Sequence, residues 1–274
     1  MAILSLFLVT LVLYAFLGFK YTVLLLGLLM FLGWFAYFED KAREHRSAEG
    51  FRGMQLFSRY GHTVIEESLP IPLKETLGEA SEVTQRFSSY IAQTLESSLV
   101  QLGIQVAPMI AWDQDKPSDR RRFIRVFTHT SRGSQLYHFF YLGVAGKYIV
   151  AHLRTQARGS YTTMDVVYFI VTAPGTIWFW GIPWLKNQYS IIAALSSWNI
   201  NAFDLIDLTT AFQASYQAIW RTVLSFLEAE NLLTDDLQQI INYNIITGTQ
   251  VNIQNSKDVR IGNILNRIQR SSRG

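Results

Sequence analysis

Residues 135–155 read QLYHFFYLGVAGKYIVAHLRT, and this stretch decides the fold class. Both halves are rich in aromatic and β-branched residues, which favour strands, and the segment VAGK at 144–147 supplies a turn between them. The stretch therefore predicts a β-hairpin with strands at 135–144 and 147–155.

Further strand-like segments lie on both sides of this hairpin. The segments SRG at 131–133 and RGS at 158–160 are typical of the loops that connect neighbouring strands. We therefore expect an antiparallel meander, whose remaining strands are 104–112, 121–129 and 165–172.

Amphipathic helices flank the predicted meander. Between residues 75 and 102, apolar side chains recur every three or four positions opposite charged ones, which is the pattern of a helix with one buried face. Residues 201–233 contain a second, longer helix of this kind, and Thr234-Asp235-Asp236 caps a short helix over 237–241. The body of the chain is therefore predicted to be α+β.

The N-terminal 38 residues differ sharply from this body. Hydrophobic residues make up 49% of the chain, and residues 1–38 carry only one charge, Lys20. Such a run predicts insertion into a bilayer, either as a hairpin of two short spans turning at 18–20 or as one span at 21–38 preceded by an interfacial helix. The predicted membrane-inserting residues are Leu6, Leu13, Leu24, Leu28, Phe31 and Trp34.

Basic residues follow this run directly, at positions 41, 43, 46, 52 and 59. The positive-inside rule then places residues 39–274 in the cytoplasm. We therefore expect an integral membrane protein whose body lies on the cytoplasmic side.

A second stretch, 166–203, also carries a single charge, Lys186. It is read either as a buried strand followed by an aromatic loop and a core helix, or as an element that lies on or enters the bilayer. In the second reading Trp178, Trp180 and Trp184 contact the membrane. Arg120, Arg121 and Arg122 are interpreted first as a solvated strand edge, and alternatively as contacts to anionic lipid head groups.

Signatures of catalysis, cofactors and metals are missing from the sequence. There is no cysteine, no G-x-S-x-G, no Walker A segment, no G-x-G-x-x-G and no H-E-x-x-H. His129, His138 and His152 fall on predicted strands but have few carboxylates nearby, so we expect ordinary strand residues and no metal site. We predict no enzymatic activity, no cofactor and no nucleic-acid partner.

The C-terminal tail repeats itself: VNIQN at 251–255 is echoed by VRIGN at 259–263. Alternating β-branched residues, amide side chains and low charge are typical of segments that pair or stack as strands. The echo fits a hairpin with a three-residue loop or two rungs of a stacked arch. The predicted oligomerisation residues are Val251, Ile253, Val259, Ile261 and Gly262.

The residues VRIG at 259–262, in their Asn-rich surroundings, resemble the RHIM-like and related bacterial amyloid-signalling motifs, which are built around [I/V]-Q-[I/V]-G. The resemblance covers 243–263 only, and Arg260 stands where those motifs prefer Gln. It implies a tail that relays oligomerisation from a receptor-like partner to a membrane-acting effector domain.

These features predict a membrane anchor at 1–38, a juxtamembrane linker at 39–74, an α+β body at 75–243 and an oligomerisation tail at 244–274. The expected function is a non-enzymatic, membrane-anchored protein that self-assembles or docks on a protein partner through its tail. A bacterial pore-forming effector of a cell-death or defence response is the more specific form of this expectation. The alternative is a structural accessory or assembly subunit of a larger membrane complex.

Overall fold

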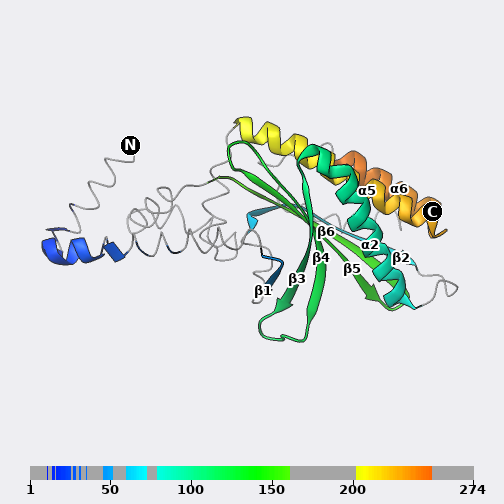
Figure 1. Cartoon of the computed structure of the whole chain (residues 1–274), viewed down its shortest axis with the longest axis horizontal. Coiled ribbons are helices and arrows are strands. Elements are labelled where there is room, and N and C mark those ends of the chain that lie inside the picture. The colour runs from blue at the N-terminus through cyan, green and yellow to red at the C-terminus, as the bar shows by residue number, and fades with distance from the viewer. Residues whose placement is uncertain are drawn as a thin grey trace, which may run out of the picture.

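The computed structural model describes residues 46–51, 60–72, 79–160 and 202–248, together with part of the N-terminal region (Figure 1). In that region the described residues are 11, 14–15, 17–25, 27–28, 31 and 35. The described body is α+β, with a six-stranded mixed sheet and helices.

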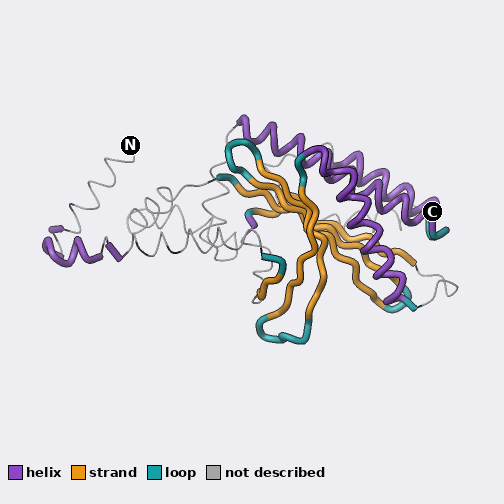
Figure 2. Tube along the Cα trace, viewed as in Figure 1, coloured by secondary structure: helices purple, strands orange, loops and turns teal. Residues whose placement is uncertain are grey.

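The sheet has the strand order β1-β3-β4-β5-β6-β2, and among the described strands only the β1–β3 pair is parallel. Figure 2 shows the strands as one twisted layer beside the helices. β3 to β6 form a meander of consecutive antiparallel strands, which β2 extends by pairing with β6. The strands are β1 (Ala48–Phe51), β2 (His62–Pro72), β3 (Gln105–Asp113), β4 (Arg120–His129), β5 (Gln135–Ala145) and β6 (Tyr148–Arg158).

One face of the sheet is covered by helices (Figure 1). They are α2 (Ala80–Leu99), which continues into the short 3-10 helix η4 (Val100–Leu102), α5 (Ala202–Ala229) and α6 (Asp235–Gly248). Phe87 of α2 stacks on Phe226 of α5 with the ring centroids 4.0 Å apart, which joins two helices far apart in the sequence. The main core lies between this helical layer and the sheet.

The opposite face of the sheet, here called the second face, carries an aromatic cluster. Because successive strand residues point to opposite sides, β4 and β5 send mainly aliphatic side chains and Phe140 to the helices, and most of their aromatic side chains to this face. Its buried members include Tyr60, Phe123, Tyr137 and Phe139. The second face therefore has an apolar centre, beside which polar side chains of β2 and β6 lie.

The predicted meander strands 104–112, 121–129, 135–144 and 147–155 each lie within a few residues of β3 to β6, whereas the predicted strand 165–172 lies outside the described residues. Of the predicted helix 75–102, residues 80–99 form α2. Its buried residues are Val83, Phe87, Ile91, Leu95 and Leu99, while Leu102 is exposed. The segment 39–74, interpreted as a linker, contributes β1 and β2, whose short or proline-containing sequences hide their strand character.

The expected membrane anchor is corrected by the structure. Among the described residues no helix combines the length and apolar character that crossing a bilayer requires. Within residues 1–38, residues 17–25 are a described helical stretch. Gly18 in this stretch has a φ of 72°, far from helical geometry.

This finding contradicts the predicted transmembrane helix or helical hairpin and the predicted integral membrane localisation. Leu24, Leu28 and Phe31, predicted to insert, are at least half exposed. Leu6, Leu13 and Trp34 lie outside the described residues.

Candidate functional site

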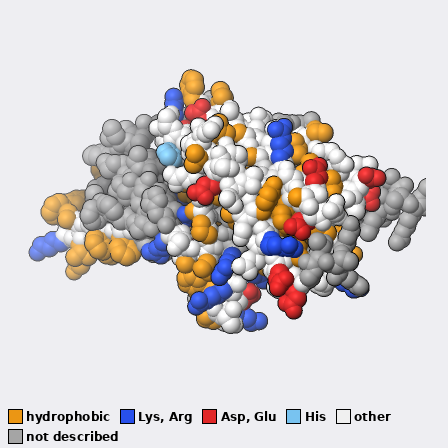
Figure 3. Space-filling model, turned by 45° about the vertical axis from the view of Figure 1, so that its right-hand side comes forward, with side chains coloured by type: hydrophobic (Ala, Val, Ile, Leu, Met, Phe, Trp, Pro, Cys, Tyr) orange, Lys and Arg blue, Asp and Glu red, His pale blue; other side chains and the backbone are white. Residues whose placement is uncertain are grey.

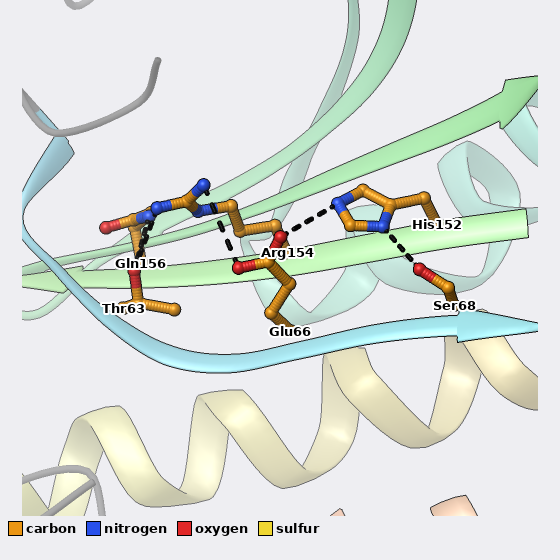
Figure 4. A network of polar contacts seen from close by, with 6 residues as sticks. All are labelled: Thr63, Glu66, Ser68, His152, Arg154 and Gln156. Carbon is orange, nitrogen blue, oxygen red and sulfur yellow. Dashed lines mark hydrogen bonds and ion pairs between the residues drawn. The ribbon is translucent and has the colours of Figure 1, made fainter. Parts of the chain in front are cut away.

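A polar network lies on the second face, where β2 pairs with β6 (Figure 4). The register places Ser68 opposite His152, Glu66 opposite Arg154, and Thr63 opposite Gln156. Residues two apart in a strand point to the same side, and the register shift between Thr63 and Ile65 brings Thr63 to the side of Glu66 and Ser68, so all six side chains share one face. These residues are called the polar network below.

At one end of the network, the ring of His152 lies between Ser68 and Glu66. Ser68 Oγ is 2.8 Å from His152 Nδ1, and His152 Nε2 is 3.4 Å from Glu66 Oε1. A carboxylate only accepts hydrogen bonds, so it favours the tautomer with the proton on Nε2. Nδ1 then accepts a hydrogen bond from the Ser68 hydroxyl.

At the other end, Arg154 holds Glu66 and is itself held by Thr63. Arg154 Nη1 is 3.8 Å from Glu66 Oε2, and Arg154 Nη2 donates to Thr63 Oγ1 at 3.1 Å. Gln156 Nε2 donates to the same hydroxyl oxygen at 3.1 Å. Two donors from β6 therefore converge on one residue of β2 and fix the position of the arginine.

Burial is the largest cause that lowers the pKa of His152 below its ordinary value. Glu66 opposes this effect, while Arg154 and Arg121 lower the pKa further. Burial therefore favours the neutral imidazole, in which Nδ1 keeps a lone pair that can accept a proton.

An aromatic ring borders the network on β5. Tyr141 is directly opposite His152 in the sheet, and the guanidinium carbon of Arg121 lies 5.6 Å from the centre of the tyrosine ring. A Cβ added to Gly143 would lie 2.9 Å from Tyr141 Cε1, so the ring extends over this glycine. The Tyr141 ring and the Arg121 cation thus flank the network on the side of the meander.

A second Ser–His pair is sealed in the main core. His138 Nε2 is 2.6 Å from Ser215 Oγ, and Nδ1 is 2.7 Å from Thr155 Oγ1. Ser215 also donates to the carbonyl of Ala211 at 2.6 Å, which uses its only proton. Burial lowers the pKa of His138 to about 3, and both residues are at most 1% exposed. This pair cross-links β5 and α5 and offers no accessible nucleophile.

Glu67 on β2 points into the same core. It accepts a hydrogen bond from the hydroxyl of Tyr216, and burial raises the pKa of Glu67 to about 7. The indole of Trp220 favours the charged form as well. However, neither Trp220 Nε1 nor Glu67 Oε1 has a hydrogen bond of ordinary geometry among the described residues. The oxygen Oε1 of Glu67 is therefore buried without a hydrogen bond among the described residues, which disfavours the charged form.

The predicted site residues are distributed unevenly. Arg120, Arg121 and Arg122 begin β4 and are exposed, and Arg121 pairs with Asp119 at 3.3 Å. On the face shown in Figure 3, basic and acidic side chains are interspersed with apolar ones. Trp178, Trp180 and Trp184 and the tail residues Val251, Ile253, Val259, Ile261 and Gly262 lie outside the described residues.

Strand alternation separates His138 from the other two strand histidines, and those two lie opposite different residues of β5. His138 faces the helices, whereas His129 and His152 face the other way, at the β4 end and on β6. In the part of the chain that the structure describes, no cluster of three or more His, Asp or Glu residues is arranged to hold a metal ion.

The sequence analysis missed the polar network, since Ser68 and His152 are 84 residues apart. The available signal was Glu-x-Ser on one strand and His-x-Arg on another, each placing two polar groups on one face. Pairing the two segments needed the β2–β6 register, which no local pattern encodes.

Comparisons with protein-family models, with curated proteins and with solved structures found no match to this chain.

Proposed function

We propose that this chain is an assembly protein, which self-associates or docks on a protein partner through its C-terminal tail. The observation that carries the proposal is the outer surface of α6, the element from which the tail continues. The proposal does not include membrane insertion or pore formation, because no helix among the described residues could span a membrane.

The outer surface of α6 is uncharged and partly apolar. Leu237 and Ile241 fill the core side of the helix, whereas Tyr243 is 46% exposed and Ile246 59% exposed on the other side. After Asp235 and Asp236 the helix has no charged residue. An exposed apolar surface on a folded body is typical of a contact with another chain.

The tail that follows supports the same function by its sequence. Residues 249–274 carry the repeated β-branched and amide pattern, which favours strand pairing between chains. Their position directly after the apolar surface of α6 places two adhesive segments next to each other in the chain.

The test is the mass of the full chain in solution, measured by light scattering during size-exclusion chromatography. We expect particles larger than one chain of 31.4 kDa. The chain ending at Gly248 keeps α6 whole and should lose the larger species, and Ile261→Asp should have the same effect. Tyr148→Ser, at the exposed β5–β6 turn, is the matched control and should assemble normally.

Assembly that persists unchanged in the chain ending at Gly248 would contradict the tail as the contact. The variant Tyr243→Ser then separates the two segments, because it weakens assembly only if the α6 surface takes part.

A further inference from the structure

We propose that Ser68 is a nucleophile activated by His152, that Glu66 is the positioning residue of this histidine, and that the site hydrolyses small carboxylic esters. This activity goes beyond the assembly function and does not depend on it. The proposal rests on the geometry of the polar network (Figure 4).

The arrangement has the three parts that an activated serine requires. The hydroxyl lies 2.8 Å from a ring nitrogen, within the range for proton transfer, and the other ring nitrogen faces a carboxylate at 3.4 Å. Arg154, which donates a hydrogen bond to Thr63, pairs with that carboxylate through its other terminal nitrogen. Such sites are recognised by geometry and roles, and the order of the residues along the chain differs between unrelated proteins.

The hydrogen bonds of His152 allow it to take the hydroxyl proton of Ser68. The carboxylate of Glu66 places the ring proton on Nε2, which leaves Nδ1 as the acceptor for the proton of Ser68. In the buried pair, by contrast, the proton of Ser215 goes to a backbone carbonyl. The groups that face His152 are Glu66 from β2, Tyr141 from β5, Arg154 on its own strand and Arg121 from β4.

The site is open to solvent. Ser68 is exposed, the side chain of Glu66 is 44% exposed and that of His152 is 26% exposed. A small ester can therefore reach the hydroxyl without any rearrangement of the core.

In the reaction, Ser68 Oγ attacks the ester carbonyl carbon while Nδ1 of His152 takes the hydroxyl proton. The carbon–alkoxy bond then breaks, and the alkoxide leaves as an alcohol with the proton from the imidazolium. Water, deprotonated by His152, attacks the acyl-serine, and the released serine oxygen regains the proton. The sum is one ester and one water giving one acid and one alcohol.

Stabilisation of the oxyanion is the weak part of the site. The backbone N–H groups of β2 and β6 lie in the plane of the sheet, so they do not point at a group above Ser68. Arg154 and Arg121 are the nearby cations, and each is already engaged by a carboxylate. We therefore expect slow turnover that is restricted to activated esters.

The experiment uses the full chain with p-nitrophenyl acetate and with a fluorophosphonate probe, which phosphonylates an activated serine and releases fluoride. We expect release of p-nitrophenol and a probe adduct that peptide mapping assigns to Ser68. Ser68→Ala should abolish both signals, whereas Ser97→Ala, which removes an exposed helix hydroxyl, should leave them unchanged. Thermal melts verify that each variant is folded.

The partners of Ser68 give the decisive results. His152→Gln should slow labelling by about 10²- to 10⁴-fold, as expected for loss of a general base. Glu66→Gln should keep the serine reactive but slow it, and it should change the pH profile of labelling, which a purely structural role would not do. Labelling that is absent, that persists in Ser68→Ala, or that is equally fast in His152→Gln overturns the proposal.

The two proposals can fail separately. The chain ending at Gly248 retains the polar network, so it should be labelled at Ser68 whether or not it assembles. A reactive Ser68 would also overturn the prediction of no enzymatic activity, which rested on missing motifs.

Discussion

At the scale of single residues, Glu67 makes stability depend on pH. Its pKa is about 7 in the folded chain against 4.5 for an ordinary Glu, so the folded state holds a proton that the unfolded state has lost between these values. Stability therefore falls as the pH rises from 4.5 to 7, by about 3 kcal/mol. In Glu67→Gln this fall should be absent, which denaturant unfolding across the pH range measures. The exposed Glu96→Gln is the control, and an unchanged pH slope in Glu67→Gln would contradict the assignment.

His138 acts in the opposite direction. Its pKa is about 3 in the folded chain against 6.5, so the unfolded state takes up the proton first and stability is lost as the pH falls from 6.5 towards 3. His138→Leu should cost about 1–3 kcal/mol at pH 7, because the hydroxyl of Thr155 loses its partner. The same variant should lose less stability than the native chain on acidification. An equal loss would show that another group causes the acid sensitivity.

Between pH 4.5 and 6.5, a rise in pH lowers stability through Glu67 and raises it through His138. The stability of the native chain therefore changes less with pH than either residue alone would cause. The Glu67→Gln variant should expose the full dependence on His138, and the double variant should be flat in this window. The pH dependence of stability arises because both side chains are buried. Neither a glutamate nor a histidine at these positions stands out in the sequence.

At the scale of elements, the start of β2 depends on Gly61. Its φ is 107°, and an added Cβ would lie 2.0 Å from the carbonyl oxygen of Ala157 on β6. We expect Gly61→Ala to lower the free energy of unfolding by about 3 kcal/mol or more, because the backbone of an edge strand must shift. Gly103→Ala is the matched control: its φ is 69°, but nothing lies within 4 Å of the added Cβ. Its cost should be about 1 kcal/mol, and equal losses would exclude the contact as the cause.

The contact of α2 with α5 depends on a stacked pair of rings. Phe87 is fully buried and lies parallel to Phe226, with an angle of 6° between the rings. Phe87→Ala should destabilise the chain by about 3–5 kcal/mol in thermal or denaturant unfolding. Tyr90→Ala removes a ring that is 36% exposed and tilted against the same Phe226, so it should cost clearly less. Similar costs would show that ring stacking is not the main contact between these helices.

Some of the helices and strands could be predicted from the sequence, and others could not. The meander and the buried face of α2 have strong local periodicity, so their bounds and core residues could be read directly. β2 could not, because Pro70 and Pro72 resemble a linker and its partner β6 lies far along the chain. The polar network could not be predicted either, because its residues on β2 and on β6 are ordinary polar residues unless the pairing of the two strands is known. The prediction of a membrane anchor rested on apolar composition alone, and among the described residues no helix combines the length and apolar character of a span.

At the scale of the whole molecule, α6 is the last helix that the structure describes, and it packs into the main core. Leu237 and Ile241 of this helix belong to the main core, and Asn244 is also buried. Removing the helix takes these side chains out of the core and exposes the side of α5 that they cover. The loss of burial costs about 1.5–3 kcal/mol for each large apolar side chain. That sum is comparable with the 5–15 kcal/mol that stabilises a typical domain. A chain ending at residue 233 should therefore lose its cooperative thermal transition or aggregate, whereas a chain ending at Gly248 should melt like the full chain. Circular dichroism melts of the three chains measure this, and a chain ending at 233 that melts normally would show that the core closes without α6.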